Sequence, residues 1–142
     1  MAHVPSKTFK LAAASDRVNL VQEIESLTEQ ASIHAGLAEE ERDSLAISVT
    51  EIANNAIIHG NRRDPKKKVF VNVRAKAGEV RVVIRDQGGG FEPDKLSNPL
   101  DPENLLRESG RGVFIVRSLM DEVNFDFSRG GTEITIIKRN KK

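Results

Sequence analysis

The fold is decided by residues 69–91, which read VFVNVRAKAGEVRVVIRDQGGGF. Apolar side chains alternate with others over residues 69–75, which is the pattern of a half-buried strand, and residues 80–85 predict the returning strand. The four residues 76–79 between them predict a turn, and therefore a hairpin. The glycine-rich segment 86–91 then ends regular structure abruptly.

The chain after this hairpin predicts a long loop, a helix and a second hairpin. Residues 91–112 contain three prolines among polar residues, and an irregular span of about twenty residues in a small domain is typical of a functional lid or a disordered segment. Apolar residues at helical spacing over residues 113–120 predict a buried helix. Alternating apolar residues over 123–127 and again over 134–136 predict two strands that pair around a turn.

The N-terminal part predicts a strand and an amphipathic helix. A weak alternation from Lys7 to Ala13 indicates a short strand. Ser15 is a candidate N-cap, because its hydroxyl can accept a hydrogen bond from a free backbone N–H of the first helical turn. A helix is expected over residues 16–35, with Gly36 as its stop. Its apolar stripe consists of Val18, Val21, Ile24, Leu27 and Ala31.

A second helix is expected from Glu39 to His59, ending at Gly60. Its first turn holds three consecutive glutamates, which the positive end of the helix dipole stabilises. Its core-facing side carries Leu45, Val49, Ile52 and Ala56. A neighbouring polar strip consists of Glu51, Asn55 and His59, which are spaced by four residues and therefore lie on one side of the helix.

The order of these elements predicts an α+β protein, with helices packed on one face of an antiparallel-dominated sheet. A length of 142 residues supports one domain. The formal net charge of +1 argues against a dedicated nucleic-acid binder. The absence of cysteine excludes disulfides, thiol catalysis and thiolate metal sites. No stretch approaches the ~20 apolar residues of a membrane span, so the cytoplasm is the expected compartment.

Three short segments are candidates for binding chemistry. Consecutive glycines after Asp86 suit a close approach between the backbone and a ligand, and the Asp86 carboxylate can accept a hydrogen bond from the amino group of a purine. Gly110-Arg111-Gly112 precedes a predicted helix, whose free N–H groups form an anion site. Glu51 and Asn55 can together hold a hard cation and position a nucleophile.

Each of these segments also has a simpler interpretation when it is taken alone. The glycines after Asp86 are equally typical of a connecting loop. Gly110-Arg111-Gly112 is more typical of an ordinary loop-to-helix turn, and a pair such as Glu51 and Asn55 is more typical of a solvated helix face.

In their order along the chain, these segments resemble the GHKL ATPase superfamily, whose members share the Bergerat fold. Within it, the chain is most similar to the bacterial anti-sigma factor serine kinases of the sporulation and general stress systems. Residues 50–60 (TEIANNAIIHG) match the N box, residues 86–91 the G1 box and residues 109–121 the G2 box. Gly130-Gly131-Thr132 matches the late Gly-Thr element of the adenine pocket. The resemblance covers residues from about 9 to 138.

This resemblance implies a two-layer α+β sandwich, with a mixed, mostly antiparallel sheet and helices on one face. It also implies ATP and Mg²⁺ as cofactors. Asn55 would ligate the magnesium ion, and Glu51 would be the base for the incoming hydroxyl. Asp86 would bind the adenine amino group, directly and through water shared with Thr132. The other implied binding residues are Gly88 and Gly90 beside the base, and Gly110, Arg111 and Gly112 at the lid hinge and the phosphates.

One residue departs from the pattern of the kinases in this family. A basic residue is expected beside Ser109-Gly110 at the start of the G2 box, and Glu108 occupies that place. Arg107 and Arg111 are the candidates to reach the terminal phosphate instead. The departure bears on the transfer rate more than on nucleotide binding.

The resemblance implies one ATPase domain of the histidine kinase type over residues 1–142, with an ATP lid at about residues 92–112. Its function would be that of a protein serine/threonine kinase that sequesters a sigma factor and phosphorylates a STAS-type antagonist of the anti-sigma factor. Two alternatives stay open: a non-catalytic ATP-binding interaction module, and a switch kinase within a larger stress-signalling assembly. No nucleic-acid or membrane partner is expected. A homodimer through the first helix is a further alternative, since family members are commonly dimers.

Overall fold

The computed structural model describes residues 4–88, 112–128 and 130–141. One sheet of five strands has the order β1-β2-β3-β5-β4. The strands are β1 (Lys7–Ala14), β2 (Lys68–Lys76), β3 (Glu79–Arg85), β4 (Glu122–Asp126) and β5 (Glu133–Arg139). The helices are α1 (Leu20–Ala35), α2 (Glu39–Asn54) and α4 (Gly112–Leu119), and a π-helical turn, η1 (Asn55–Gly60), continues α2.

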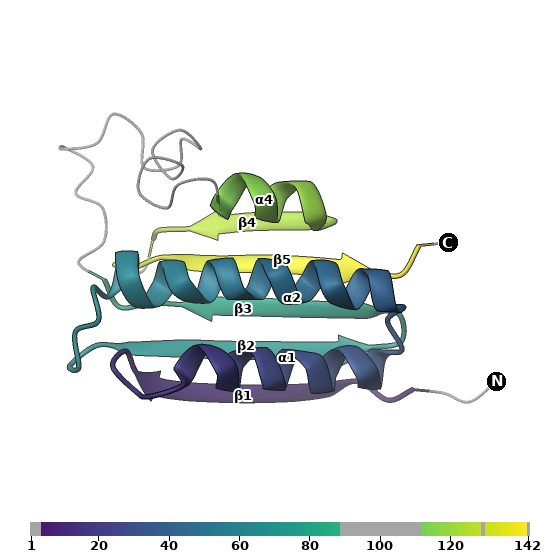
Figure 1. Ribbon diagram of the computed structural model, residues 1–142, viewed down its shortest axis with the longest axis horizontal. Coiled ribbons are helices and arrows are strands. Elements are labelled where there is room, and N and C mark those ends of the chain that lie inside the picture. The colour runs from purple at the N-terminus through teal and green to yellow at the C-terminus, as the bar shows by residue number, and fades with distance from the viewer. Residues whose placement is uncertain (1–3, 89–111, 129, 142) are drawn as a thin grey trace.

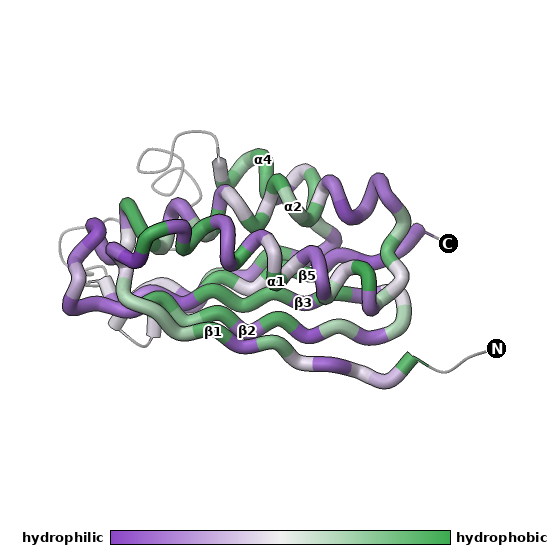
Figure 2. The backbone as a smooth tube through the Cα atoms, turned by 60° about the horizontal axis from the view of Figure 1, so that its bottom comes forward, coloured by the Kyte–Doolittle hydropathy of each residue, from purple (hydrophilic) through white to green (hydrophobic). Residues whose placement is uncertain are grey.

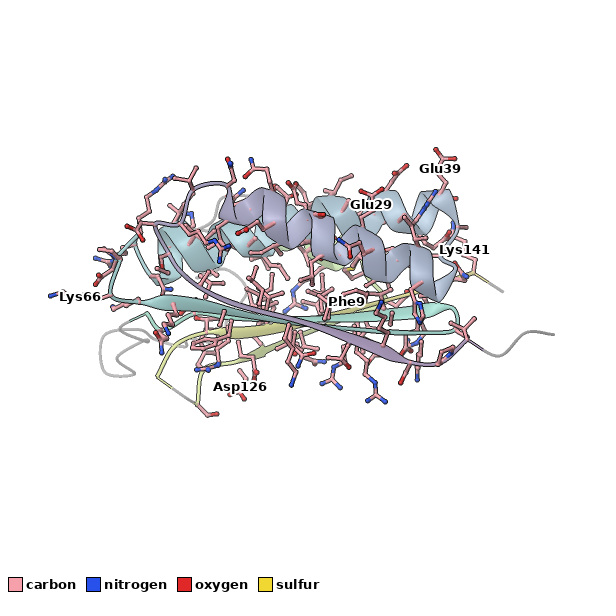
Figure 3. All side chains as sticks on the ribbon, turned by 90° about the horizontal axis from the view of Figure 1, so that it is seen from below. Phe9, Glu29, Glu39, Lys66, Asp126 and Lys141 are labelled. Carbon is pink, nitrogen blue, oxygen red and sulfur yellow. The ribbon has the colours of Figure 1, made fainter. Side chains whose placement is uncertain are left out.

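The structure is a two-layer sandwich, as the sequence predicts. All four pairings between the described strands are antiparallel. Figure 1 shows α1 along β1 and β2, α2 along β3 and β5, and α4 beside β4. The described helices all lie on one face of the sheet, and the side chains of the opposite face project away from them (Figure 3). None of these helices combines the length and the apolar character of a membrane-spanning segment.

The strand register follows from the alternation of side chains, which Figure 2 shows as changes of hydropathy along the strands. On β2 and β3 the buried positions pair with one another, for example Val71 with Ile84 and Val73 with Val82. Between them stand exposed residues such as Arg74 and Arg81, which face the other side. A slip of one residue would turn these arginines into the core, so the pattern specifies a single register.

The first helix begins later than the sequence predicts, and Ser15 is not its N-cap. The helix starts at Leu20, after Asn19 in a left-handed conformation. Ser15 is buried and its hydroxyl donates a 2.8 Å hydrogen bond to the carbonyl oxygen of Lys67, because β1 pairs with β2 up to the preceding residue. Val18 is 80% exposed and does not belong to the apolar stripe. The predicted stop at Gly36 is confirmed, with φ of 73°.

The helix α4 is amphipathic, whereas the sequence predicts a buried helix over residues 113–120. Val113 and Val116 are buried against the rest of the protein, but Phe114 is 64% exposed. The helix packs mainly along α2 and lies at the β4 end of the sheet, so only one of its sides meets the core (Figure 1). The strands β4 and β5, which follow α4 in the sequence, form the predicted second hairpin.

The second helix ends in a π-helical turn that its sequence pattern does not predict. The backbone N–H of Asn61 donates to the carbonyl oxygen of Ala56 at 2.9 Å, five residues back. Because a π-helix bonds from i to i+5, four residues no longer complete one turn. His59 is exposed and leaves the line of Glu51 and Asn55, so the predicted three-residue polar strip is corrected to a pair.

Asn61, directly after this turn, joins four segments of the chain. Its side chain is 1% exposed. The amide nitrogen donates to the Ser15 hydroxyl at 2.7 Å and to the Lys68 carbonyl oxygen at 2.8 Å. The amide oxygen accepts from the backbone N–H of Gln87 at 2.7 Å. One buried amide therefore fixes the end of η1 against the ends of β1, β2 and β3.

We expect Asn61→Ala to lower the free energy of unfolding by about 2–4 kcal/mol, because it leaves buried backbone and hydroxyl groups without partners. Denaturant unfolding followed by circular dichroism measures this loss. Asn124→Ala, at an exposed position of β4, is the matched control and should change the free energy by less than about 0.5 kcal/mol. Equal effects of the two substitutions would show that the Asn61 side chain does not join these segments.

Candidate functional site

The residue after β3, Asp86, carries a buried carboxyl group. Its side chain is 4% exposed. One oxygen, Oδ1, accepts hydrogen bonds from the backbone N–H of Gly88 at 2.9 Å and of Thr132 at 3.1 Å. The Asp86 N–H in turn donates to the Thr132 carbonyl oxygen at 3.0 Å. These bonds extend the pairing of β3 with β5 and bring Asp86 together with Thr132, two residues that the sequence assigns to one pocket.

Three glycines from distant segments enclose this carboxyl group. A Cβ on Gly60 would collide with Asp86 Oδ2, and a Cβ on Gly131 would collide with the Asp86 carbonyl oxygen. A Cβ on Gly88 would collide with the carbonyl oxygen of Gly60 and lie 3.1 Å from Asp86 Oδ1. Glycine is therefore the residue that lets the backbone close around Asp86 at each of these places.

Burial raises the pKa of the Asp86 carboxyl, because the charged form loses its water. The hydrogen bonds from Gly88 and Thr132, and the positive charges of Lys67 and Arg85, act in the opposite direction and favour ionisation. Within the described residues, no donor satisfies the second oxygen, Oδ2. The site therefore offers a buried acceptor to an N–H group of a ligand, in an environment typical of functional carboxyl groups.

A second group of site residues lies where α2 meets α4. Glu51 and Asn55 are both half-buried, one turn apart, and the Asn55 N–H still bonds to the Glu51 carbonyl oxygen. A Cβ on Gly112, the first residue of α4, would lie 2.5 Å from Glu51 Oε2. The Glu51 carboxylate therefore sits at the N-terminal end of α4, where the helix dipole favours a negative charge.

One turn of the chain connects the two groups. Asn55 is the first residue of η1 and Gly60 is its last. Asn55 stands beside Glu51, and Gly60 packs against Asp86. This arrangement can hold an extended ligand, with a hydrogen-bond acceptor at one end and a carboxylate with a carboxamide at the other.

Several predicted site residues lie outside the described part of the chain. These residues are Gly90, Gly110 and Arg111, together with Arg107 and Glu108. The lid expected at residues 92–112 also lies there, apart from Gly112.

Sequence reasoning missed Asn61 and the roles of Gly60 and Gly131 as walls around Asp86. The one available signal was an asparagine directly after the glycine that ends the second helix. That pattern is also typical of an ordinary exposed turn. Only the burial of Asn61 distinguishes the two cases, and this burial depends on where β3 ends.

Comparison with known proteins places this geometry in a family. The family model of the histidine kinase-like ATPase domain matches residues 14–138. The anti-sigma F factor of Anoxybacillus flavithermus is 38% identical over 99 residues, which make up 66% of this chain and 66% of that protein. The serine-protein kinase RsbW of Staphylococcus epidermidis is 30% identical over 115 residues, or 76% of this chain and 72% of the kinase. The chain thus spans about two thirds of the length of these relatives.

Solved structures agree on the fold. The structure of the RsbU and RsbW domains of Rv1364c from Mycobacterium tuberculosis matches 96% of this chain and 34% of that one, with a TM-score of 0.61 at 15% identity. The catalytic domain of the histidine kinase ThkA matches 94% of this chain and 96% of its own, with a TM-score of 0.53 at 13% identity. Sheet, helices and sequence together show that the chain belongs to the histidine kinase-like ATPase domain family, in the group of anti-sigma factors and RsbW-like serine kinases.

Proposed function

We propose that this protein binds ATP with Mg²⁺ and transfers the γ-phosphoryl group to a serine or threonine of a STAS-type antagonist protein, while it also sequesters a sigma factor. The observation that carries the proposal is the buried Asp86 carboxyl, which three glycines enclose and which keeps one oxygen without a donor among the described residues. The relatives named as an anti-sigma factor and as a serine-protein kinase support the choice of partners.

At the adenine end, Asp86 would accept a hydrogen bond from the exocyclic amino group. Its Oδ1 is already engaged by Gly88 and Thr132, so Oδ2 is the oxygen that the base would use. Thr132 would share a water molecule with the base, and Gly88 and Gly90 would let the backbone pass close to it. Adenine bound here would exclude water from the Asp86 carboxylate. Because this carboxylate has already lost most of its hydration, the hydrogen bond forms at little further desolvation cost.

At the phosphate end, Asn55 offers a neutral oxygen to a hard cation. Within the described residues its side chain makes no hydrogen bond, so the amide oxygen is available. Mg²⁺, when bound, neutralises charge on the phosphates and takes such an oxygen among its ligands. Gly112, with Gly110 and Arg111, would present backbone N–H groups or positive charge to the same phosphates.

Glu51 would accept the proton of the attacking hydroxyl group. In the transfer, the hydroxyl oxygen of the substrate bonds to the γ-phosphorus, the bond from that phosphorus to the bridging oxygen breaks, and ADP leaves. The released proton passes to the Glu51 carboxylate. The Glu51 carboxylate lies against the first residue of α4, Gly112, beside the expected phosphate site, and this position supports its role as base.

The proposal extends to the organisation of the chain. Residues 1–142 would form one ATPase domain, and residues 92–112 would close over the nucleotide as a lid. The protein would act in the cytoplasm, where ATP and sigma factors meet. The competing function is a non-catalytic ATP-binding module, and tight ATP binding without any phosphoprotein would favour it.

Asp86→Asn should weaken ATP binding by at least about 30-fold, because the adenine amino group loses a charged acceptor in a buried site. Isothermal titration with ATP and Mg²⁺ measures the affinity. The control is Asp43→Asn, which makes the same change at an exposed position of α2 and should leave the affinity unaltered. An unchanged affinity in Asp86→Asn would exclude Asp86 from the adenine site.

The same substitution should not destabilise the nucleotide-free protein at neutral pH. Since the folded state raises the pKa of Asp86, it holds that proton more tightly than the unfolded chain. The free energy of unfolding therefore falls as the pH rises from about 4 through the raised pKa of Asp86. Asp86→Asn has no such proton to lose. In urea unfolding curves, its free energy of unfolding relative to that of the wild type should therefore increase as the pH rises from about 4.

Glu51→Gln should lower the rate of phosphoryl transfer by about 10²–10⁴-fold and leave ATP affinity within about twofold, since the base acts in the transfer and not in binding. Labelled ATP and a candidate antagonist protein provide the assay. Glu29→Gln on the exposed side of α1 is the control. Full transfer by Glu51→Gln would show that another group takes the proton.

A further inference from the structure

The face of the sheet opposite the helices carries an unmatched group of positive charges. A hollow of about 700 Å³ lies on this face over β1, β2, β3 and the start of β5. Four basic side chains line it, Lys10, Arg74, Arg81 and Arg85, against one acidic side chain, Glu133. None of the four makes an ion pair with a described residue. Figure 3 shows side chains that end in nitrogen atoms and project from this face.

The placement of these charges is unfavourable for the isolated fold. Arg74 on β2 and Arg81 on β3 are directly opposite one another in the register, and both side chains are exposed on the same face. Like charges at such cross-strand positions are destabilising. Lys10 stands opposite Asn72, one step along the same face, and adds a third positive charge.

The adjoining end of the same sheet is built differently. There Lys76 pairs with Glu79 at 3.2 Å, and Arg139 pairs with Glu79 at 2.7 Å and also with Glu122. Each basic residue in this row has a carboxylate partner. By contrast, neither Arg74 nor Arg81 has an ion-pair partner among the described residues.

Apolar surface lies between the unmatched charges. Phe70, Val83 and Ala12 line the hollow, and the guanidinium carbon of Arg85 lies 4.2 Å from the ring centroid of Phe70. Strands are about 4.8 Å apart, so the basic positions on β1, β2 and β3 span a width of about 10 Å. That width suits one extended segment or one helix of a partner.

We propose that this open face, lined by Lys10, Arg74, Arg81 and Arg85, docks an acidic segment of a partner protein whose carboxylates alternate with apolar side chains. The carboxylates meet the four basic residues, and the apolar side chains cover Phe70 and Val83. The face is formed by the sheet and does not include Asp86, Glu51 or Asn55, so the inference is independent of the proposed nucleotide chemistry.

The observations favour a protein segment over a nucleic acid. A single-stranded nucleic acid needs aromatic rings on which bases stack. Among the described residues that line the hollow, Phe70 is the one aromatic residue, and Arg85 already covers its ring. Glu133 in the hollow also repels a continuous chain of phosphates, whereas a peptide can place an uncharged residue there.

A direct test uses the full-length protein and a fluorescein-labelled ten-residue peptide of alternating Glu and Leu. Fluorescence anisotropy should show binding that weakens as salt is raised. The double variant Arg74→Glu/Arg81→Glu should weaken it at least about tenfold and keep the wild-type ATP affinity. The control Arg42→Glu/Arg117→Glu has the same net charge on the helical layer and should stay within about twofold.

Three outcomes would overturn the proposal. The first is equal loss of peptide binding in the two double variants, because it would reveal a general effect of net charge. The second is tighter binding of single-stranded DNA with the same number of charges, which would assign the face to a nucleic acid. The third is a dimer in sedimentation velocity that the Arg74→Glu/Arg81→Glu variant abolishes and the peptide does not displace, which would assign the face to a second copy of the chain.

Discussion

Burial of one carboxyl group at the end of β3 is the constraint on which the site depends. Asp86 has lost most of its water, and two backbone N–H groups, from Gly88 and Thr132, compensate it only in part. The backbone can close around the group because the residues that meet it are glycines from η1, from the loop after β3 and from the turn before β5. In the proposed function, the adenine amino group completes the hydrogen bonds of this carboxyl group.

The fold could be predicted largely from side-chain alternation, and the errors lie where tertiary contacts decide. Both hairpins, the strand at Lys7 and the helix stop at Gly36 follow from local patterns and match the structure. Ser15 was assigned to a helix cap because its sequence neighbours allow it. Pairing of β1 with β2 instead places its hydroxyl on the Lys67 carbonyl oxygen, a contact between residues 52 positions apart that no local pattern contains.

The site could be predicted in part. Its polar residues have types that indicate binding chemistry, whereas the residues that enclose them do not. The resemblance places Asp86 and Thr132 in one pocket, and the fold brings them together. It assigns Glu51 and Gly112 separate roles, and the structure places them in contact. The π-helical turn was missed because η1 has no distinct composition. Asn61 could not be predicted because a buried asparagine and an exposed one have the same sequence signature. The open basic face could not be predicted because it depends on the strand register, which places Arg74 opposite Arg81.

The ATP affinity of Gly60→Ala shows most directly whether the enclosed Asp86 carboxyl group binds the nucleotide. The added methyl group would collide with Asp86 Oδ2, the oxygen assigned to adenine. Ile58→Ala, a partly exposed position in the same turn, serves as the control. We expect Gly60→Ala to fold and to lose ATP binding in isothermal titration, whereas Ile58→Ala retains it. A folded Gly60→Ala protein with wild-type affinity would contradict the role of the enclosed carboxyl group.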